Sequence, residues 1–307
     1  MIKICVTSPS FSKNEVLREE LLRWFPGSIF NDNGERLEGN RLIEYLSHAD
    51  GVVIGLEKMN KTIIDSIPSL KIISKFGVGL DNIDLTYCRS KNIRIGWTPG
   101  VNKLSVAEMT LSFMIMLLRN LYTTSNQLKN GVWNKSGGLN LTGKTVGIIG
   151  VGNIGKEVIR LLGPFKCRVL VNDIIDQSEY YKDNECIEVS KDEIFSQSDI
   201  ITIHTPLDES TKYLVNSEMM NKIKKTSFVI NTARGGIINM ADLKKALKDG
   251  AIAGAAVDVY EGEPPVDREL LCIPNLICTP HIGGNSYESV VSMGRSAISH
   301  LQEFFKT

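Results

Sequence analysis

Short apolar runs alternate along the chain with longer segments in which apolar residues recur at helical spacing. In the first hundred residues, amphipathic segments at 14–25 and 40–47 predict helices. Four apolar runs around them predict strands at Ile2–Thr7, Gly51–Ile54, Leu70–Ser74 and Ile93–Ile95. This alternation of strand and helix is typical of α/β folds with a parallel sheet.

The same alternation resumes after a break at Pro99 and Gly100. The segment Lys103–Arg119 predicts one long helix, which is apolar on nearly every face and is therefore expected to be buried or packed against another subunit. Further helices are expected at 153–162, 241–248 and 286–305. Strands are predicted at Thr145–Ile149, Arg168–Asn172, Ile200–His204, Phe228–Asn231, Ile252–Val257 and Leu276–Cys278. We therefore expect two doubly wound, Rossmann-like parallel-sheet domains, the second beginning near Lys144.

Composition and charge narrow the class of protein. A chain of 307 residues is typical of about two domains, and its 35 basic and 35 acidic residues leave no excess charge to attract nucleic acid or a membrane surface. The apolar run Leu104–Leu118 contains Glu108 and is too short to cross a bilayer. The opening segment Met1–Thr7 is too short for a secretion signal, so a cytoplasmic protein is expected. The six cysteines are scattered, which predicts neither a disulfide nor a metal site.

The strongest local motif is Gly150-Val-Gly152-Asn-Ile-Gly155, which follows one predicted strand and opens a predicted helix. In a dinucleotide site the first glycine permits the tight turn and the second admits the pyrophosphate. The third allows the helix to pack closely on the strand. The helix amino terminus adds free N–H groups and a favourable dipole for the anion. An ordinary strand–helix turn is the alternative reading of such a motif.

Asp173 strengthens the nucleotide interpretation. It ends the next predicted strand, 18 residues after Gly155, where an acidic side chain can bind a ribose diol. A carboxylate at this place would repel the additional 2′-phosphate of NADP, and no arginine follows it. The sequence therefore favours NAD as the cofactor.

Three residues supply the chemistry that the reduction of a 2-keto acid needs. Arg234 can grip a carboxylate, His281 can donate a proton near neutral pH, and Glu263 can orient the imidazole. Each follows a predicted strand, and the carboxyl ends of parallel strands meet at the edge where open α/β sheets bind ligands. Taken alone, each residue would be structural more often than catalytic, and His204, at the end of a strand, could be a capping or wall residue. His48 and His300 are expected to be solvated bystanders.

Longer strings resemble the D-isomer-specific 2-hydroxyacid dehydrogenases, in order along nearly the whole chain. In the second half these are Val146-Gly-Ile-Ile-Gly-Val-Gly-Asn-Ile-Gly155, His204-Thr-Pro-Leu207, Asn231-Thr-Ala-Arg-Gly-Gly-Ile237, Ala256-Val-Asp-Val-Tyr-Glu-Gly-Glu-Pro264 and Thr279-Pro-His-Ile-Gly-Gly284. In the first they are Phe76-Gly-Val-Gly-Leu-Asp-Asn-Ile-Asp84 and Ser105-Val-Ala-Glu108.

The resemblance implies a discontinuous outer, substrate-binding domain (1–98 and 284–307), an NAD-binding domain (99–283) and a homodimer built on the helix 103–119. It implies that Arg234 binds substrate, that His281 is the acid/base and that Glu263 is its partner. Substrate contacts would also come from Lys75, Val78 and Gly79. Cofactor contacts would come from Gly150, Gly152, Asn153, Ile154, Gly155, Asp173, His204, Thr205, Pro206, Thr232, Ala233, Arg234, Asp258, His281, Gly283 and Gly284.

Within the family, the strings Arg234-Gly-Gly-Ile and Glu263-Pro-Pro are most similar to phosphoglycerate dehydrogenases. Those enzymes often carry an arginine after the second strand, whereas this chain has Val53-Ile-Gly-Leu56, and Lys75 stands where an arginine is frequent. 3-Phosphoglycerate is therefore one candidate substrate. Two other readings of the fold stay open: an NAD(H)-responsive binding scaffold, and a dehydrogenase of formate or phosphite.

Overall fold

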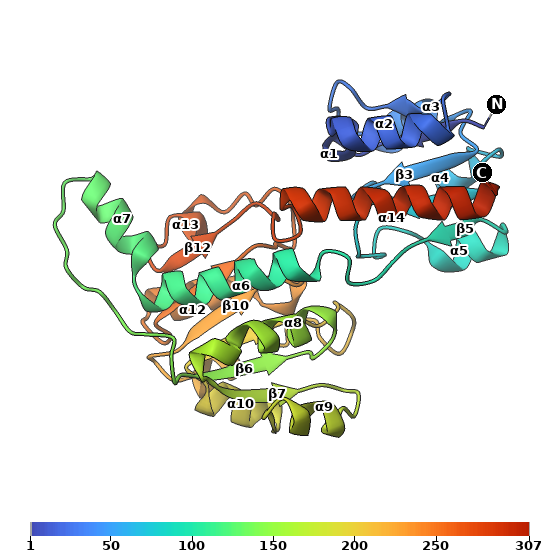
Figure 1. The fold of residues 1–307 in the computed structure, drawn as a ribbon. Coiled ribbons are helices and arrows are strands. Elements are labelled where there is room, and N and C mark those ends of the chain that lie inside the picture. Colours follow the sequence, from blue (N-terminus) through green and yellow to red (C-terminus); the bar gives the residue numbers. More distant parts are fainter. Residues whose placement is uncertain (1, 307) are drawn as a thin grey trace. The chain divides into compact units, whose positions relative to one another are not determined.

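The computed structural model describes residues 2–306. The chain divides into two compact units, one formed by Met1–Asn102 with Gly284–Thr307 and the other by Lys103–Gly283. Each unit is a doubly wound α/β fold with its own parallel sheet (Figure 1). The predicted fold class, including an outer unit that is discontinuous in sequence, is confirmed.

The first unit contains a five-stranded sheet. Its strands are β1 (Ile4–Val6), β2 (Ile29–Phe30), β3 (Gly51–Ile54), β4 (Ile72–Lys75) and β5 (Arg94–Gly96), in the order β2-β1-β3-β4-β5. One face is packed by α1 (Pro9–Ser12), α2 (Glu15–Trp24) and α14 (Tyr287–Phe305), and the other by α3 (Gly39–Leu46), α4 (Lys61–Asp65) and α5 (Leu85–Ser90). Because both faces are buried, the inner strands β1 and β3 read as continuous apolar runs.

The second unit contains a seven-stranded sheet. Its strands are β6 (Thr145–Ile149), β7 (Arg168–Asn172), β8 (Ile187–Glu188), β9 (Ile200–Ile203), β10 (Phe228–Asn231), β11 (Gly254–Val257) and β12 (Leu276–Cys278). They run parallel in the order β12-β11-β10-β9-β6-β7-β8. The order reverses between β6 and β9, and the carboxyl ends of strands at such a switch point form the ligand crevice of open α/β sheets.

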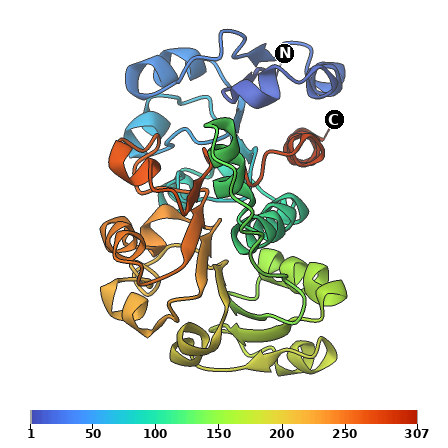
Figure 2. The same cartoon turned by 90° about the vertical axis from the view of Figure 1, so that its left-hand side faces the viewer.

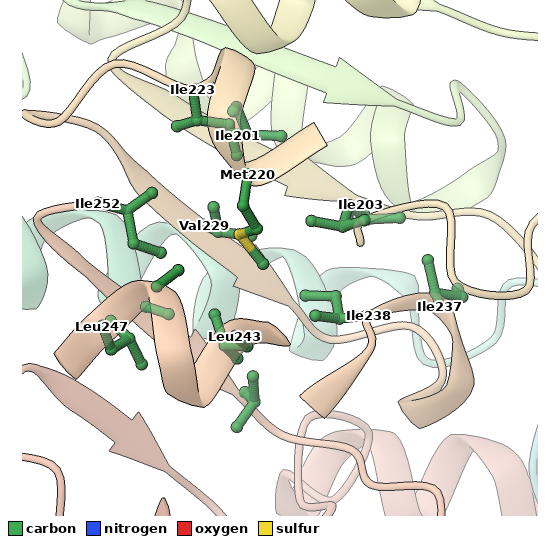
Figure 3. Packing of buried hydrophobic residues seen from close by; sticks show 14 of the residues in the cluster. Ile201, Ile203, Met220, Ile223, Val229, Ile237, Ile238, Leu243, Leu247 and Ile252 are labelled. Atoms are coloured by element: carbon green, nitrogen blue, oxygen red, sulfur yellow. The ribbon is translucent and has the colours of Figure 1, made fainter. Parts of the chain in front are cut away.

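Helices cover both faces of this larger sheet (Figure 2). One face carries α6 (Lys103–Leu118), α8 (Asn153–Leu162) and α9 (Ser178–Asp183). The other carries α10 (Lys191–Gln197), α11 (Ser217–Lys222), α12 (Met240–Lys248) and α13 (Arg268–Leu271), and Figure 3 shows the side chains of the apolar cluster on that face. The remaining helix, α7 (Leu121–Lys129), buries none of its residues.

Predicted and observed element bounds agree best in the interior of the sheets. The strands expected at 51–54, 145–149, 168–172, 228–231 and 276–278 have those bounds. The expected strand Ile2–Thr7 is reduced to Ile4–Val6, and Ile252–Val257 begins only at Gly254. The edge strands β2 and β8 were not predicted. Each has only two residues, and Ile29 in β2 and Ile187 in β8 are exposed to solvent.

Candidate active site

The glycine-rich turn joins β6 to α8 at the switch point of the second unit. Gly150 has a φ of +93°, and a Cβ there would lie 2.7 Å from the carbonyl carbon of His204, so only glycine fits. At Gly155 a Cβ would lie 2.2 Å from the oxygen of Gly150, whereas at Gly152 it would meet nothing within 4 Å. The open space at Gly152 lies at the N-cap of α8, where no side chain caps the helix. The turn therefore leaves helix N–H groups accessible to an anion.

Alanine at two of these glycines is expected to separate folding from nucleotide binding. Gly155→Ala should lower the free energy of unfolding by about 1–3 kcal/mol, because the new methyl group overlaps a carbonyl. Gly152→Ala should change it by less than about 0.5 kcal/mol, yet weaken NADH binding by occupying the space beside the helix amino terminus. Urea unfolding and NADH fluorescence titration measure the two effects. Wild-type NADH affinity in Gly152→Ala would place the pyrophosphate elsewhere.

Asp173 follows β7 directly and is half-buried beside this turn. One carboxylate oxygen accepts a hydrogen bond of 2.6 Å from the N–H of Val151, and the other accepts one of 2.9 Å from the N–H of Ile175. The side chain is thus held against the glycine-rich turn, in the place where a ribose hydroxyl would meet an acidic group.

The segment after β9 crosses close to the same turn. His204 is buried and its Nε2 lies 3.0 Å from the hydroxyl of Thr202, and burial lowers the pKa of His204 to about 3. His204 is therefore neutral at physiological pH. Within residues 2–306, the buried His204 Nδ1 and Thr205 Oγ1 have no hydrogen-bond partner. Buried polar atoms that lack a partner beside the glycine-rich turn can form hydrogen bonds with a ligand.

Asn231, the last residue of β10, shapes the turn that carries Arg234. Its side-chain oxygen accepts a hydrogen bond of 3.0 Å from the N–H of Ala233, and its amide donates one of 2.8 Å to the carbonyl of Arg234. The hydroxyl of Thr232 lies 3.1 Å from that of Thr110 on α6. The guanidinium of Arg234 donates to the carbonyl of Ala233 at 2.8 Å. The side chain of Asn231, which is fully buried, thus fixes the backbone turn from which Arg234 extends.

Glu263 and His281 follow the next two strands of the sheet, β11 and β12, and lie in contact. Nδ1 of His281 is 2.8 Å from one carboxylate oxygen of Glu263 and 3.0 Å from the other. One Glu263 oxygen also accepts a hydrogen bond of 3.2 Å from the N–H of Tyr260. Because the carboxylate engages Nδ1, Nε2 is the nitrogen suited to exchange a proton with a ligand.

Asp258 holds the turn on which His281 stands. It is 1% exposed, and its two carboxylate oxygens accept hydrogen bonds from the hydroxyl of Thr279 at 2.6 Å and from the N–H groups of Ile282 at 2.9 Å and Gly283 at 2.8 Å. Its own carbonyl accepts one of 2.8 Å from the N–H of His281. His281 has a φ of +54°, a left-handed conformation that needs such support.

The first unit contributes its candidate residues at the carboxyl end of β4. Lys75 is 4% exposed, and its Nζ donates to the carbonyl of Gly55 at 2.5 Å and to the side-chain oxygen of Asn82 at 2.7 Å. The loop that follows contains Gly77, with a φ of +136°, and Val78, whose carbonyl accepts a hydrogen bond of 2.8 Å from the indole of Trp97. Lys75 thus ends β4, and Val78 and Gly79 lie on the loop that follows it.

Comparison with known proteins places these features in a family. The family described as "D-isomer specific 2-hydroxyacid dehydrogenase, NAD binding domain" matches residues 111–283. A hydroxypyruvate reductase of Thermotoga maritima is 36% identical over 278 residues, which is 89% of this chain and 89% of that protein. The chain belongs to the D-isomer-specific 2-hydroxyacid dehydrogenases. It is accordingly an NAD-dependent oxidoreductase that acts on the CH–OH group of small 2-hydroxy acids.

Other members of this family match over the whole chain. A D-3-phosphoglycerate dehydrogenase of Methanocaldococcus jannaschii is 33% identical over 100% of this chain, which spans only 58% of that relative's length. A D-lactate dehydrogenase of Aquifex aeolicus, solved with NAD and lactic acid, superimposes with a TM-score of 0.85 at 25% identity, over 99% of this chain and 95% of the other. The relatives thus act on different 2-hydroxy acids.

The 2-hydroxyacid dehydrogenase strings of the second unit converge on one edge of its sheet. The structure brings Glu263 and His281 into contact. Arg234 follows β10, which is the neighbour of β11, the strand that precedes Glu263. His300, which was expected to be a solvated bystander, is half-buried, and its Nε2 lies 2.9 Å from the hydroxyl of Thr98. The sequence assigned no function to Thr110, a hydroxyl inside an apolar helix, or to Thr279, although Thr279 begins one of the strings that resemble the family.

Within residues 2–306, no single helix is long and apolar enough to cross a membrane; only α6 and α7 together, bent by 64°, have the required length and composition.

Proposed function

We propose that the chain interconverts a three-carbon 2-keto acid of the hydroxypyruvate type and its D-2-hydroxy acid, with NADH as the reductant. The observation that carries this proposal is the contact of 2.8 Å between His281 Nδ1 and Glu263, beside the turn that presents Arg234. A carboxylate-oriented imidazole next to an arginine suits a ketone that carries a neighbouring carboxylate. Formate, which has no such ketone, needs no proton relay.

We assign the binding of the substrate carboxylate to Arg234. Its guanidinium would bind the carboxylate bidentately and polarise the neighbouring carbonyl. His281 would donate a proton from Nε2 to the carbonyl oxygen as that oxygen gains charge. Glu263 would stabilise the protonated imidazole and keep Nε2 directed at the substrate. NADH supplies the hydride that goes to C2 of the keto acid.

The residues around the glycine-rich turn suit NAD. We assign the pyrophosphate to the N–H groups of Asn153 and Ile154 beside Gly152, and the ribose to Asp173. The nicotinamide side is assigned to the segment His204–Pro206, the turn Thr232–Arg234, Asp258, His281, Gly283 and Gly284. Support comes from the partnerless polar atoms of His204 and Thr205 in this neighbourhood.

The first unit favours an unphosphorylated substrate. The loop after β3 contains Leu56, which is 75% exposed, and no cation stands between Val53 and Leu56. The Nζ of Lys75 already donates hydrogen bonds to Gly55 and Asn82, so it has little donor capacity left for a phosphate in addition to a carboxylate. We assign Lys75, Val78 and Gly79 to the substrate carboxylate. The phosphoglycerate dehydrogenase relatives make phosphohydroxypyruvate the second candidate.

Asp173 is expected to enforce the preference for NADH over NADPH. Asp173→Asn keeps an acceptor for one of the two backbone N–H groups and removes the charge that repels a 2′-phosphate. We expect the ratio of kcat/KM for NADPH to that for NADH to rise about tenfold. Steady-state kinetics with both nucleotides measure this ratio, and Asp176→Asn, on the exposed neighbouring residue, is the control. An unchanged ratio in Asp173→Asn would remove Asp173 from the ribose site.

We further propose a homodimer. The sequence placed its interface on the helix 103–119, but most apolar residues of α6 are covered within its own unit. We therefore extend the proposed interface to the arm, which is defined here as α7 with residues 130–140. The arm extends away from the sheet of its own unit (Figure 1) and exposes apolar side chains of Leu121, Leu128, Val132, Trp133 and Leu139. Trp133 is 77% exposed. A series of exposed apolar residues of this kind marks a protein interface.

Trp133→Ser is expected to shift the chain from dimer to monomer. Sedimentation velocity of the wild type should give twice the chain mass of 34.0 kDa, and the variant should show a monomer population at micromolar concentration. Leu22→Ser, on an exposed apolar residue of α2, is the matched control and should leave the dimer intact. A monomeric wild type would contradict the proposed assembly.

The reaction and the substrate are tested together by following NADH absorbance with a panel of acids. The panel contains hydroxypyruvate, phosphohydroxypyruvate, glyoxylate, pyruvate, 2-oxoglutarate and, with NAD, formate. We expect hydroxypyruvate to give the highest kcat/KM. A higher value for phosphohydroxypyruvate would contradict the interpretation of the first unit, and turnover of formate alone would contradict the assigned proton relay.

A further inference from the structure

A segment outside the assigned machinery contacts the loops of two assigned residues. It follows β9 and contains Tyr213, whose N–H donates a hydrogen bond of 2.8 Å to the carbonyl of Gly236. The hydroxyl of the same tyrosine donates one of 3.0 Å to the carboxylate of Glu261. Gly236 stands two residues after Arg234, and Glu261 stands two residues before Glu263. One side chain therefore links the arginine loop to the glutamate loop.

The backbone of Tyr213 lies in a region that is unfavourable for a tyrosine. Its φ is +51°, in the left-handed region that glycine and asparagine adopt far more readily. Strained residues of this kind persist where specific contacts hold them, and they gather at functional sites. Just beyond it, Val215 bridges in parallel with Ile238, so the segment runs alongside the chain that leaves the arginine turn.

Close packing makes the link stiff. A Cβ at Gly235 would lie 2.0 Å from the carbonyl carbon of Tyr260, so the arginine loop passes directly against the glutamate loop. A Cβ at Gly236 would lie 4.0 Å from Cγ of Glu261 and 3.2 Å from Leu207. The aliphatic part of the Glu261 side chain therefore packs against Gly236. With so little space between the segments, a shift of one loop moves the other.

We propose that Tyr213 is a positioning residue, which sets the spacing between Arg234 and the Glu263–His281 pair by joining Gly236 to Glu261. The proposal rests on the functions assigned above to Arg234, Glu263 and His281. The hydrogen bond from Tyr213 to Glu261 raises the pKa of the phenol, so the hydroxyl stays protonated and donates throughout the neutral range. Small errors in the placement of reacting groups have large effects on rate.

A double-mutant cycle tests the link. Tyr213→Phe removes only the hydroxyl, and Glu261→Ala removes its acceptor. Each is expected to lower kcat about three- to tenfold, with KM for NADH unchanged, and the double variant should be no slower than the slower single variant. The matched control is Tyr87→Phe, which removes a similar tyrosine–carboxylate hydrogen bond to Asp65 in the other unit and should leave kcat unchanged.

Tyr213→Asn separates positioning from stability. Asparagine tolerates the left-handed conformation, so this variant should unfold at the same or a higher temperature while kcat still falls. A purely structural tyrosine would instead lose stability and keep its kcat per folded molecule. Wild-type kcat in Tyr213→Phe, or additive losses in the double variant, would overturn the proposal.

Hydrogen exchange keeps this test distinct from a test of the proposed function. With NADH bound, Tyr213→Phe should increase amide exchange in residues 234–238 and 260–263, and Tyr87→Phe should not. This readout needs no turnover. An inactive wild type would refute the proposed function, but the exchange result would still decide whether Tyr213 links the two loops. Unchanged exchange in an active enzyme would refute the link and leave the proposed function standing.

Discussion

Replacing Arg234 with alanine is expected to lower kcat/KM for hydroxypyruvate by about 1,000-fold, because the variant loses the cation that holds the substrate carboxylate and polarises the ketone. The loss should fall on both kcat and KM, since the carboxylate is bound in the ground state and in the transition state. The dissociation constant of NADH should change by less than about threefold, because NADH carries no group that depends on a full positive charge there. Stopped-flow kinetics and fluorescence titration measure the two quantities.

Two further variants sharpen the test of Arg234. Arg234→Lys keeps the charge but not the planar fork, so it should recover only part of the lost rate. Arg168→Ala removes an exposed arginine at the opposite, amino-terminal edge of the same sheet and should leave the kinetics unchanged. Normal turnover of 2-keto acids by Arg234→Ala would show that the substrate carboxylate is bound by another group.

The second large effect is expected at His281. His281→Asn should lower kcat by about 100- to 10,000-fold, because the variant loses the proton donor that we assign to the carbonyl oxygen. Asparagine suits this position structurally, since it tolerates the φ of +54° and leaves the bond from the residue 281 N–H to Asp258 intact. The variant should therefore fold and bind NADH like the wild type. His48→Asn, on an exposed histidine, is the control.

Glu263→Gln distinguishes the function of the carboxylate from that of the imidazole. Glutamine keeps an acceptor for Nδ1 but removes the negative charge beside the imidazole, so the ring stays oriented while its electrostatic support is lost. We expect kcat to fall at least about tenfold, with the dissociation constant of NADH unchanged. Wild-type kcat in Glu263→Gln would mean that the charge of Glu263 does not assist the proton donor.

The sequence predicted the buried parts of the fold. Strands such as β6 and β10 were recognised because both of their faces are buried and their residues form unbroken apolar runs. Gly150 and Asp173 were proposed for the nucleotide site because a tight turn and the following strand end require those residue types at that spacing. Arg234 and His281 were proposed because each follows a strand in a glycine-bearing turn, and their functions remain predictions.

The parts that were missed depend on contacts between segments far apart in sequence. Asp258 was expected to contact cofactor, whereas its carboxylate also organises the turn of His281 through Thr279 and two backbone N–H groups. Tyr213 gave no signal, because its left-handed backbone and its bond to Glu261 are visible only in three dimensions. The edge strands β2 and β8 are too short to have a period.

The most direct test of the central claim is to reduce hydroxypyruvate with NADH in which both hydrogens at C4 of the nicotinamide are replaced by deuterium. We predict one deuterium at C2 of the glycerate formed, only the D-enantiomer, and no such transfer with His281→Asn in the same time. Label lost to water, L-glycerate as the product, or NADH bound without any transfer to the acids of the panel would contradict the account.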